Sequence, residues 1–281
     1  MRESSKRRGF SRLRGGADPE QDYMAATREL STSLVLVAPL LVVYQVGILL
    51  VDNANNGVDF VSGGLLRLIS WVLLQVVPAD ASGQIVVEPS LVYQTYLGVN
   101  FVLLAVIGVV IWLLRKRGHF RLNLWPKLLL ECSIYALLFS GVVTGLMSIF
   151  GLHRLLAIPG GEAALATAGG PEGWSALIAS IGAGLHEEIV FRLGLLSGLF
   201  YLFKRFVRLS PLAAGVLAVL LSSAIFSAVH HIGPVGDPFT LGVFFYRLFA
   251  GVVLAAIFQV RGFAVAVYTH ALYDVLVMVI R

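Results

Sequence analysis

The chain has 281 residues, of which 58% are hydrophobic and only 13% carry a charge. Soluble domains carry about 25% charged residues, so this composition argues against a soluble fold and for an integral membrane protein. The net charge of +5 comes from basic residues gathered in the N-terminal tail and in short loops. That pattern is typical of loops held on the cytoplasmic side of a membrane, and it does not indicate nucleic-acid binding. The single cysteine, Cys132, excludes an internal disulfide and a cysteine metal cluster.

The chain divides into a polar tail and a long apolar domain. Residues 1–29 are polar and mixed in charge, and we predict a disordered basic cytoplasmic tail followed by a transmembrane domain over 30–281. The apolar runs are about 20 residues long, enough to cross a bilayer as helices, and they do not alternate as barrel strands would. Seven runs predict crossing helices: 31–51, 91–114, 128–150, 174–202, 211–231, 240–259 and 263–280. We therefore expect an all-α polytopic transmembrane bundle.

An eighth apolar stretch, 60–77, is ambiguous because it is short and contains Arg67. If it crossed, the N-terminal tail and the basic segment 115–121 would lie on opposite sides of the membrane. If it is re-entrant or interfacial, the strongly basic segments all lie inside, as the positive-inside rule favours. We predict seven crossing helices and one non-crossing helix, with the N-terminus cytoplasmic; eight crossing helices is the alternative.

Charged side chains inside the span 174–202 are the first functional signal. A charged side chain near the bilayer centre costs roughly 2.5–3.5 kcal/mol on translocon scales, so it needs a partner or a function. Glu188 and Arg192 lie four residues apart and predict an ion pair on one helical face. That pairing leaves Glu187 as the working group. The segment is not a zincin motif, because Val190 stands where the second histidine would be.

Two later spans carry the remaining polar groups. Phe226 and His230 lie near the end of 211–231, and His270 and Asp274 share a helical face in the middle of the last span. Each cluster alone could be a buried network that only holds helices together. Because all of them occur in the C-terminal half of the chain, we predict that they form one polar site inside the bundle.

These clusters read in order EEIVFR (187–192), FSAVH (226–230) and HALYD (270–274). They resemble the pattern of the CPBP family of intramembrane proteases, named after CAAX proteases and bacteriocin-processing enzymes and also called Abi. That pattern is E-E-x-x-x-R, then F-x-x-x-H, then H-x-x-x-N, each on its own transmembrane helix. The resemblance covers about 174–281, which it identifies as the protease core. Asp274 departs from the pattern, because it stands where the family usually has asparagine.

The resemblance implies an intramembrane endopeptidase that hydrolyses a peptide bond of a membrane-associated protein or peptide. It implies that Glu187 and His230 activate a water molecule, and that His270 and Asp274 stabilise the oxyanion unless Asp274 instead orients His270. Supporting roles fall to Glu188, Arg192 and Phe226. No cofactor is expected. The alternative is a divalent metal such as zinc, held by Glu187, His230 and His270.

The expected partners are a membrane-anchored substrate and the lipid bilayer, with no nucleic acid. The short chain has no soluble domain, which suggests a compact bacterial or archaeal member of the family, and we expect it in the inner (cell) membrane of a bacterium. A different class also fits intramembrane Glu, His and Asp residues, namely a proton-coupled transporter that uses them as a relay. The sequence shows no duplicated halves with matching broken helices, which argues against that alternative.

Overall fold

The computed structural model describes residues 19–51, 60–78, 87–116, 122–157, 172–232 and 236–280. Every regular element within these ranges is a helix, which confirms the predicted all-α bundle. The elements are α1 (Pro19–Arg28), α2 (Leu30–Gly47), α3 (Phe60–Val76), α4 (Pro89–Lys116), α5 (Trp125–Ile149), α7 (Gly173–Glu187), a π-helix (Glu188–Leu196), α8 (Ser197–Arg205), α9 (Pro211–Val229), α10 (Leu241–Arg261) and α11 (Phe263–Met278), with short 3₁₀ turns at Leu122–Leu124 and His153–Ala157.

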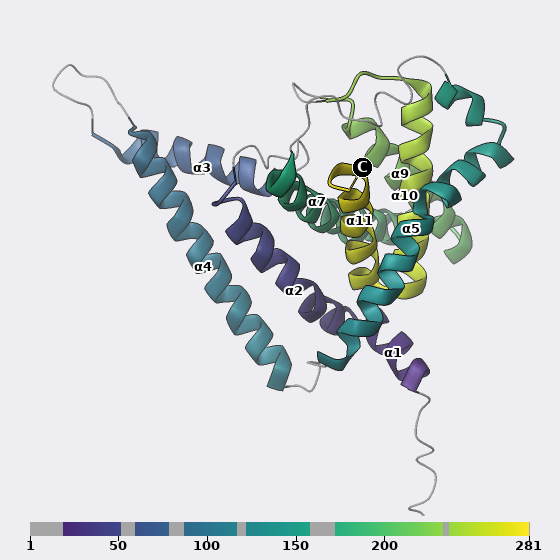
Figure 1. The fold of residues 1–281 in the computed structure, drawn as a ribbon, viewed down its shortest axis with the longest axis horizontal. Helices are drawn as coiled ribbons and strands as arrows, with labels where there is room; N and C mark the ends of the chain where they lie inside the picture. The colour runs from purple at the N-terminus through teal and green to yellow at the C-terminus, as the bar shows by residue number, and fades with distance from the viewer. Residues whose placement is uncertain are drawn as a thin grey trace, which may run out of the picture.

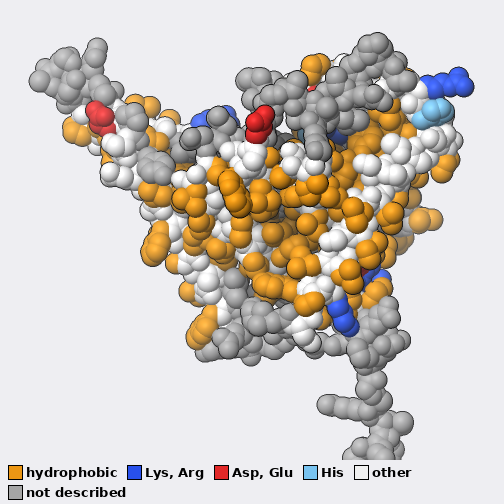
Figure 2. Space-filling view, in the orientation of Figure 1, with side chains coloured by type: hydrophobic (Ala, Val, Ile, Leu, Met, Phe, Trp, Pro, Cys, Tyr) orange, Lys and Arg blue, Asp and Glu red, His pale blue; other side chains and the backbone are white. Residues whose placement is uncertain are grey.

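Within the described residues, five helices are long and apolar enough to cross a membrane: α2, α4, α5, α9 and α10. They match five of the seven predicted spans. The predicted span 263–280 is α11, which is shorter at 16 residues, and 174–202 is divided into α7, the π-helix and α8. Figure 2 shows hydrophobic side chains across the middle of the visible face and charged ones near its margins. The chain is an integral membrane protein.

Helix α3 lies across the ends of α2 and α4 instead of alongside them (Figure 1). Its Ile69 and Leu73 pack against Tyr96 of α4 and against Ile48 and Leu49 at the end of α2. This helix covers the ambiguous stretch 60–77. Its transverse orientation agrees with the predicted non-crossing helix, because a helix that crossed would run beside its neighbours.

Helix α1 corrects the predicted boundary of the tail. Residues 1–29 were expected to be disordered, but 19–28 are helical, while 1–18 lie outside the described residues. The Tyr23 hydroxyl donates a hydrogen bond to Glu131 of α5. Burial and the adjacent carboxylate raise the pKa of the Tyr23 phenol, so it remains a donor. Polar composition predicted disorder, but one buried tyrosine with a carboxylate partner anchors the helix.

The same carboxylate joins α1 to the turn between α10 and α11. Arg261 donates two hydrogen bonds to Glu131, at 2.6 and 2.9 Å, and Arg28 donates to the carbonyl oxygen of Val260 at 2.6 Å. Gly262 links α10 to α11 with φ 97°, and a Cβ there would lie 2.2 Å from the carbonyl oxygen of Thr27. Glycine is therefore required at this turn both by the backbone and by the close approach of α1.

The closest approach at the centre of the bundle joins α7 to α11. Gly184 of α7 packs against the backbone of Ala271, and a Cβ at Gly184 would lie 2.5 Å from the Ala271 nitrogen. Figure 1 shows α7 running obliquely across α11, between α2 and the α9–α10 pair. This contact brings the end of α7 next to the middle of α11, where the predicted site residues of both helices lie.

We expect Gly184→Ala to lower the free energy of unfolding by about 1–3 kcal/mol, because the added methyl group overpacks the α7–α11 contact. Gly198→Ala in α8 is the matched control, since no atom lies within 4 Å of a Cβ at Gly198, and alanine there favours the helix by up to about 1 kcal/mol. Thermal unfolding of the two purified variants in detergent measures the difference. Equal stability would contradict the close contact.

Candidate active site

The site is centred on a change of helix type. Helix α7 ends at Glu187 and continues directly into the π-helix Glu188–Leu196, whose i→i+5 hydrogen bonds widen the turn. Such segments are rare and occur frequently at functional sites. The Ser197 hydroxyl donates to the Arg192 carbonyl oxygen at 3.0 Å, five residues back along the chain. The predicted helix 174–202 is thus correct in extent but not in its assumed regular α geometry.

The three charged residues of this segment are all buried: Glu187 is 2% exposed, Glu188 0% and Arg192 1%. The predicted ion pair is present, with Arg192 Nε 3.1 Å from Glu188 Oε2. The guanidinium carbon of Arg192 lies 4.6 Å from the centre of the Phe226 ring, a cation–π contact. Arg192 Nη2 also donates to the Gly251 carbonyl oxygen of α10 at 3.4 Å. Arg192 therefore links the π-helix to α9 and α10.

His270 of α11 lies between carboxylates. Its Nδ1 donates to Glu188 Oε1 at 2.8 Å, which fixes the orientation of the ring. Its Nε2 lies 3.6 Å from Glu187 Oε2 and 3.6 Å from Asp274 Oδ2. The two glutamates thus approach opposite nitrogens of one imidazole, and Asp274 stands on the same side as Glu187.

His230, at the end of α9, faces Glu187 from the other side. Its Nδ1 donates to the Phe226 carbonyl oxygen at 2.7 Å, so that Nε2 is turned to Glu187 Oε1, 3.8 Å away. The Phe226 ring packs against that of His230, with centroids 4.9 Å apart. The His230 side chain is 18% exposed, more than any of its partners described above. The site is therefore deeply buried on its glutamate side and more open at His230.

The structure brings together every residue that the sequence predicted for the site. The side chains come from the α7–π-helix run, α9 and α11: Glu187, Glu188, Arg192, Phe226, His230, His270 and Asp274. The orientation of His270, a role suggested above for Asp274, is set by a different residue. The residue that holds His270 Nδ1 is Glu188, and it does so while it pairs with Arg192. No local pattern indicates this bond, because the two residues are 82 positions apart.

Asp237 is a residue near the site that sequence reasoning missed. It forms an ion pair with Arg247 of α10. The Asp237 backbone N–H donates to the His230 carbonyl oxygen at 2.9 Å, and His231 Nδ1 donates to the Asp237 carbonyl oxygen at 3.1 Å. This cluster holds the chain that follows α9 and fixes the end of the helix where His230 lies.

His186, next to the two glutamates, does not take part in the site. Its Nδ1 is 2.8 Å from the Gly182 carbonyl oxygen, and its ring packs edge-on against Tyr44 of α2, with centroids 4.7 Å apart. It is buried between α7 and α2. Its role is therefore in helix packing.

A metal ion in a protein is held by several side chains that converge on it. Among the described residues, no group of three or more His, Cys, Asp or Glu side chains is arranged to hold a metal ion. Structural and catalytic zinc sites use three or four such ligands. The metal alternative, with Glu187, His230 and His270 as ligands, stays a prediction.

Comparison with known proteins identifies one family. Residues 169–276 match the family model described as type II CAAX prenyl endopeptidase Rce1-like. The matched segment overlaps the predicted protease core and contains all of the site residues named above. No curated protein and no solved structure matches the chain.

Proposed function

We propose that this protein is an intramembrane endopeptidase in which Glu187 activates the attacking water, since residues 169–276 match the Rce1-like CAAX prenyl endopeptidase model. That match supports a membrane protease that acts on membrane-associated proteins. The observation that carries the finer proposal is the convergence of Glu187, His230 and His270 from three helices in one buried site. Carboxylate and imidazole groups this close support general acid–base chemistry.

Glu187 is the general base in this proposal. Its two oxygens face His230 Nε2 at 3.8 Å and His270 Nε2 at 3.6 Å. Polar groups separated by more than 3.5 Å can be joined by a water molecule. The water gives a proton to Glu187 while its oxygen attacks the carbonyl carbon of the scissile bond. His230 Nε2 orients that water, because the bond from Nδ1 to Phe226 turns the ring toward Glu187.

His270 stabilises the oxyanion that this attack creates. In this proposal His270 is an imidazolium paired with the carboxylates of Glu187 and Glu188, and both of its nitrogens donate. Nδ1 is engaged by Glu188, so Nε2 is the donor for the oxyanion. Donors held in place in a site that excludes water stabilise developing negative charge strongly. When the C–N bond breaks, Glu187 returns its proton to the leaving amine. Glu187 is then a carboxylate again, and His270 no longer faces an oxyanion.

Asp274 supplies a second donor to the oxyanion when it is protonated. We expect Asp274→Asn to keep activity within about tenfold, because the asparagine amide donates at the same position, and Asp274→Leu to lower it about 10²–10³-fold. Hydrolysis of one membrane substrate by each purified variant measures this. At alkaline pH, wild type should lose activity that the asparagine variant retains. An equal loss of activity in Asp274→Asn and Asp274→Leu would show that Asp274 does not act by donating a hydrogen bond to the oxyanion.

The metal-free mechanism stays a prediction with a direct test. No step above passes through a metal. Enzyme treated with EDTA and then freed of it should hydrolyse substrate at the original rate. Loss of activity that added zinc restores would establish the metal alternative instead.

We place the protein in a bacterial cell membrane with its N-terminus inside. Basic residues gather at the end of the bundle where α1 docks: Arg28 contacts Val260, Arg261 pairs with Glu131 and Lys127 lies 5.9 Å from the Tyr23 ring. That distribution agrees with the positive-inside rule. A cysteine introduced at Arg205 should react with a membrane-impermeant reagent only after cells are opened. Labelling in intact cells would indicate the opposite orientation.

The experiment that tests the proposed function compares membrane proteins, including their C-termini, in cells with wild-type protein and with Glu187→Gln. A protease produces cleaved membrane proteins whose new C-termini are lost in the variant. A proton-coupled transporter would change solute flux and leave every C-terminus unchanged. That second outcome would overturn the proposal.

A further inference from the structure

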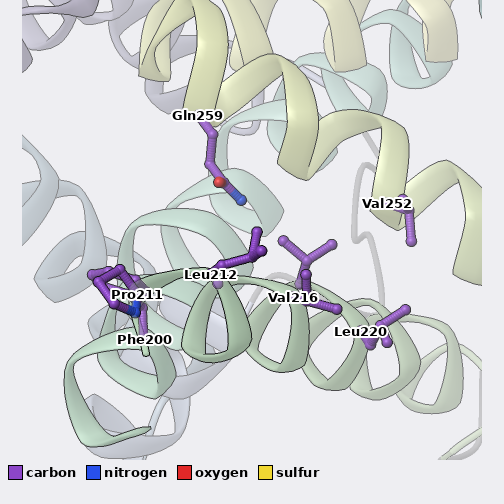
Figure 3. A pocket seen from close by; sticks show the side chains of 9 residues that line it. Phe200, Pro211, Leu212, Val216, Leu220, Val252 and Gln259 are labelled. Carbon is purple, nitrogen blue, oxygen red and sulfur yellow. The ribbon is translucent and has the colours of Figure 1, made fainter. Parts of the chain in front are cut away.

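A groove of about 410 Å³ opens between α8, α9 and α10 (Figure 3). Leu212, Val216 and Leu220 line it along α9, and Phe200 lines it from α8. The described lining residues include none of the proposed catalytic side chains. This groove is therefore separate from the candidate active site.

The groove is apolar along most of its length and polar at one end. Figure 3 shows Gln259 of α10 opposite Leu212, and Val252 opposite Leu220 at the other end. Gln259 is the only side chain with a polar group among the described residues that line it. From Leu212 to Leu220 the helix rises roughly 12 Å. The groove is therefore long and apolar, with its one polar lining side chain at one end.

Basic residues stand at the polar end of the groove. Lys204 and Arg205 in the last turn of α8 and Arg208 in the connector to α9 are all exposed. The Lys204 ammonium lies 5.8 Å from the centre of the Phe200 ring, which lines the groove. The sequences 197–232 and 241–261 contain no acidic residue. Positive charge at this end is therefore not neutralised by a carboxylate of these helices.

We propose that the groove binds one acyl chain of an anionic phospholipid, with the lipid phosphate held by Lys204, Arg205 and Arg208. The apolar walls suit a hydrocarbon chain. Each basic residue near a membrane surface raises the affinity for anionic lipid about fivefold.

Native mass spectrometry of the full-length protein in neutral detergent tests the headgroup. The protein is titrated with phosphatidylglycerol or with phosphatidylcholine that has the same acyl chains. We expect one phosphatidylglycerol to bind more tightly than phosphatidylcholine. The triple variant Lys204→Gln/Arg205→Gln/Arg208→Gln should lose that preference, by about fivefold for each charge removed. Equal affinity of wild type for the two lipids, or an unchanged preference in the triple variant, would overturn the proposal.

A second pair of variants tests the groove itself. Val216→Trp fills the groove and should weaken binding of both lipids, whereas Val106→Trp on α4 should not; the two valines are 50% and 53% exposed. Lys127→Gln is the control for loss of a positive charge elsewhere. Thermal unfolding without added lipid verifies that each variant is folded, and the triple variant alters only exposed side chains. Wild-type binding by Val216→Trp, or a loss in Lys127→Gln as large as in the triple variant, would also overturn the proposal.

Discussion

Glu187→Gln lowers the rate of peptide-bond hydrolysis by about 10²–10⁴-fold, the usual contribution of a general base, while the protein stays folded. The amide has the size of the carboxylate but cannot accept the proton of the attacking water. The Glu188–Arg192 ion pair and the bond from His270 to Glu188 do not depend on Glu187. Loss of activity is therefore expected without loss of the framework around the site.

The substrate for this measurement is a membrane protein whose new C-terminus depends on the wild-type enzyme in cells. Purified enzyme and substrate are reconstituted together, and the cleaved product is followed with time. Glu172→Gln is the control, because Glu172 is an exposed glutamate at the start of the same helix. A Glu187→Gln enzyme with nearly wild-type kcat would remove Glu187 from the mechanism.

The second large effect is on stability and comes from Glu188. We expect Glu188→Gln to lower the free energy of unfolding by about 3–5 kcal/mol, because it leaves the buried charge of Arg192 without its carboxylate. Arg192 is only 1% exposed and cannot turn to solvent. The same change replaces the carboxylate that accepts from His270 Nδ1 with a neutral amide oxygen, which is a weaker acceptor, so activity should fall as well.

Unfolding of the purified variants in detergent separates the two roles of Glu188. The double variant Glu188→Gln/Arg192→Met removes both charges and keeps apolar contact with Phe226, so it should recover part of the lost stability. It should not recover kcat, because His270 still lacks its carboxylate partner. Glu187→Gln should be more stable than Glu188→Gln. Equal unfolding temperatures for those two single variants would refute the assignment of the ion pair.

Local features of this protein could be predicted from its sequence. The apolar runs identify the crossing helices, because each run must by itself cover the thickness of a bilayer. The pairing of Glu188 with Arg192 follows from a spacing of four residues on one helix, and the structure contains it. The motif residues of the later spans were also recognisable, because polar side chains in an apolar segment stand out.

The contacts between distant parts of the chain could be identified only from the tertiary structure. The bond from His270 to Glu188 spans 82 positions, and Glu131 joins α1 to the end of α10 through Tyr23 and Arg261. The change to a π-helix after Glu187 likewise leaves no mark in the hydropathy pattern. Spacing along a helix determines which side chains share a face. The packing of whole helices, such as α7 against α11 at Gly184, decides which faces meet.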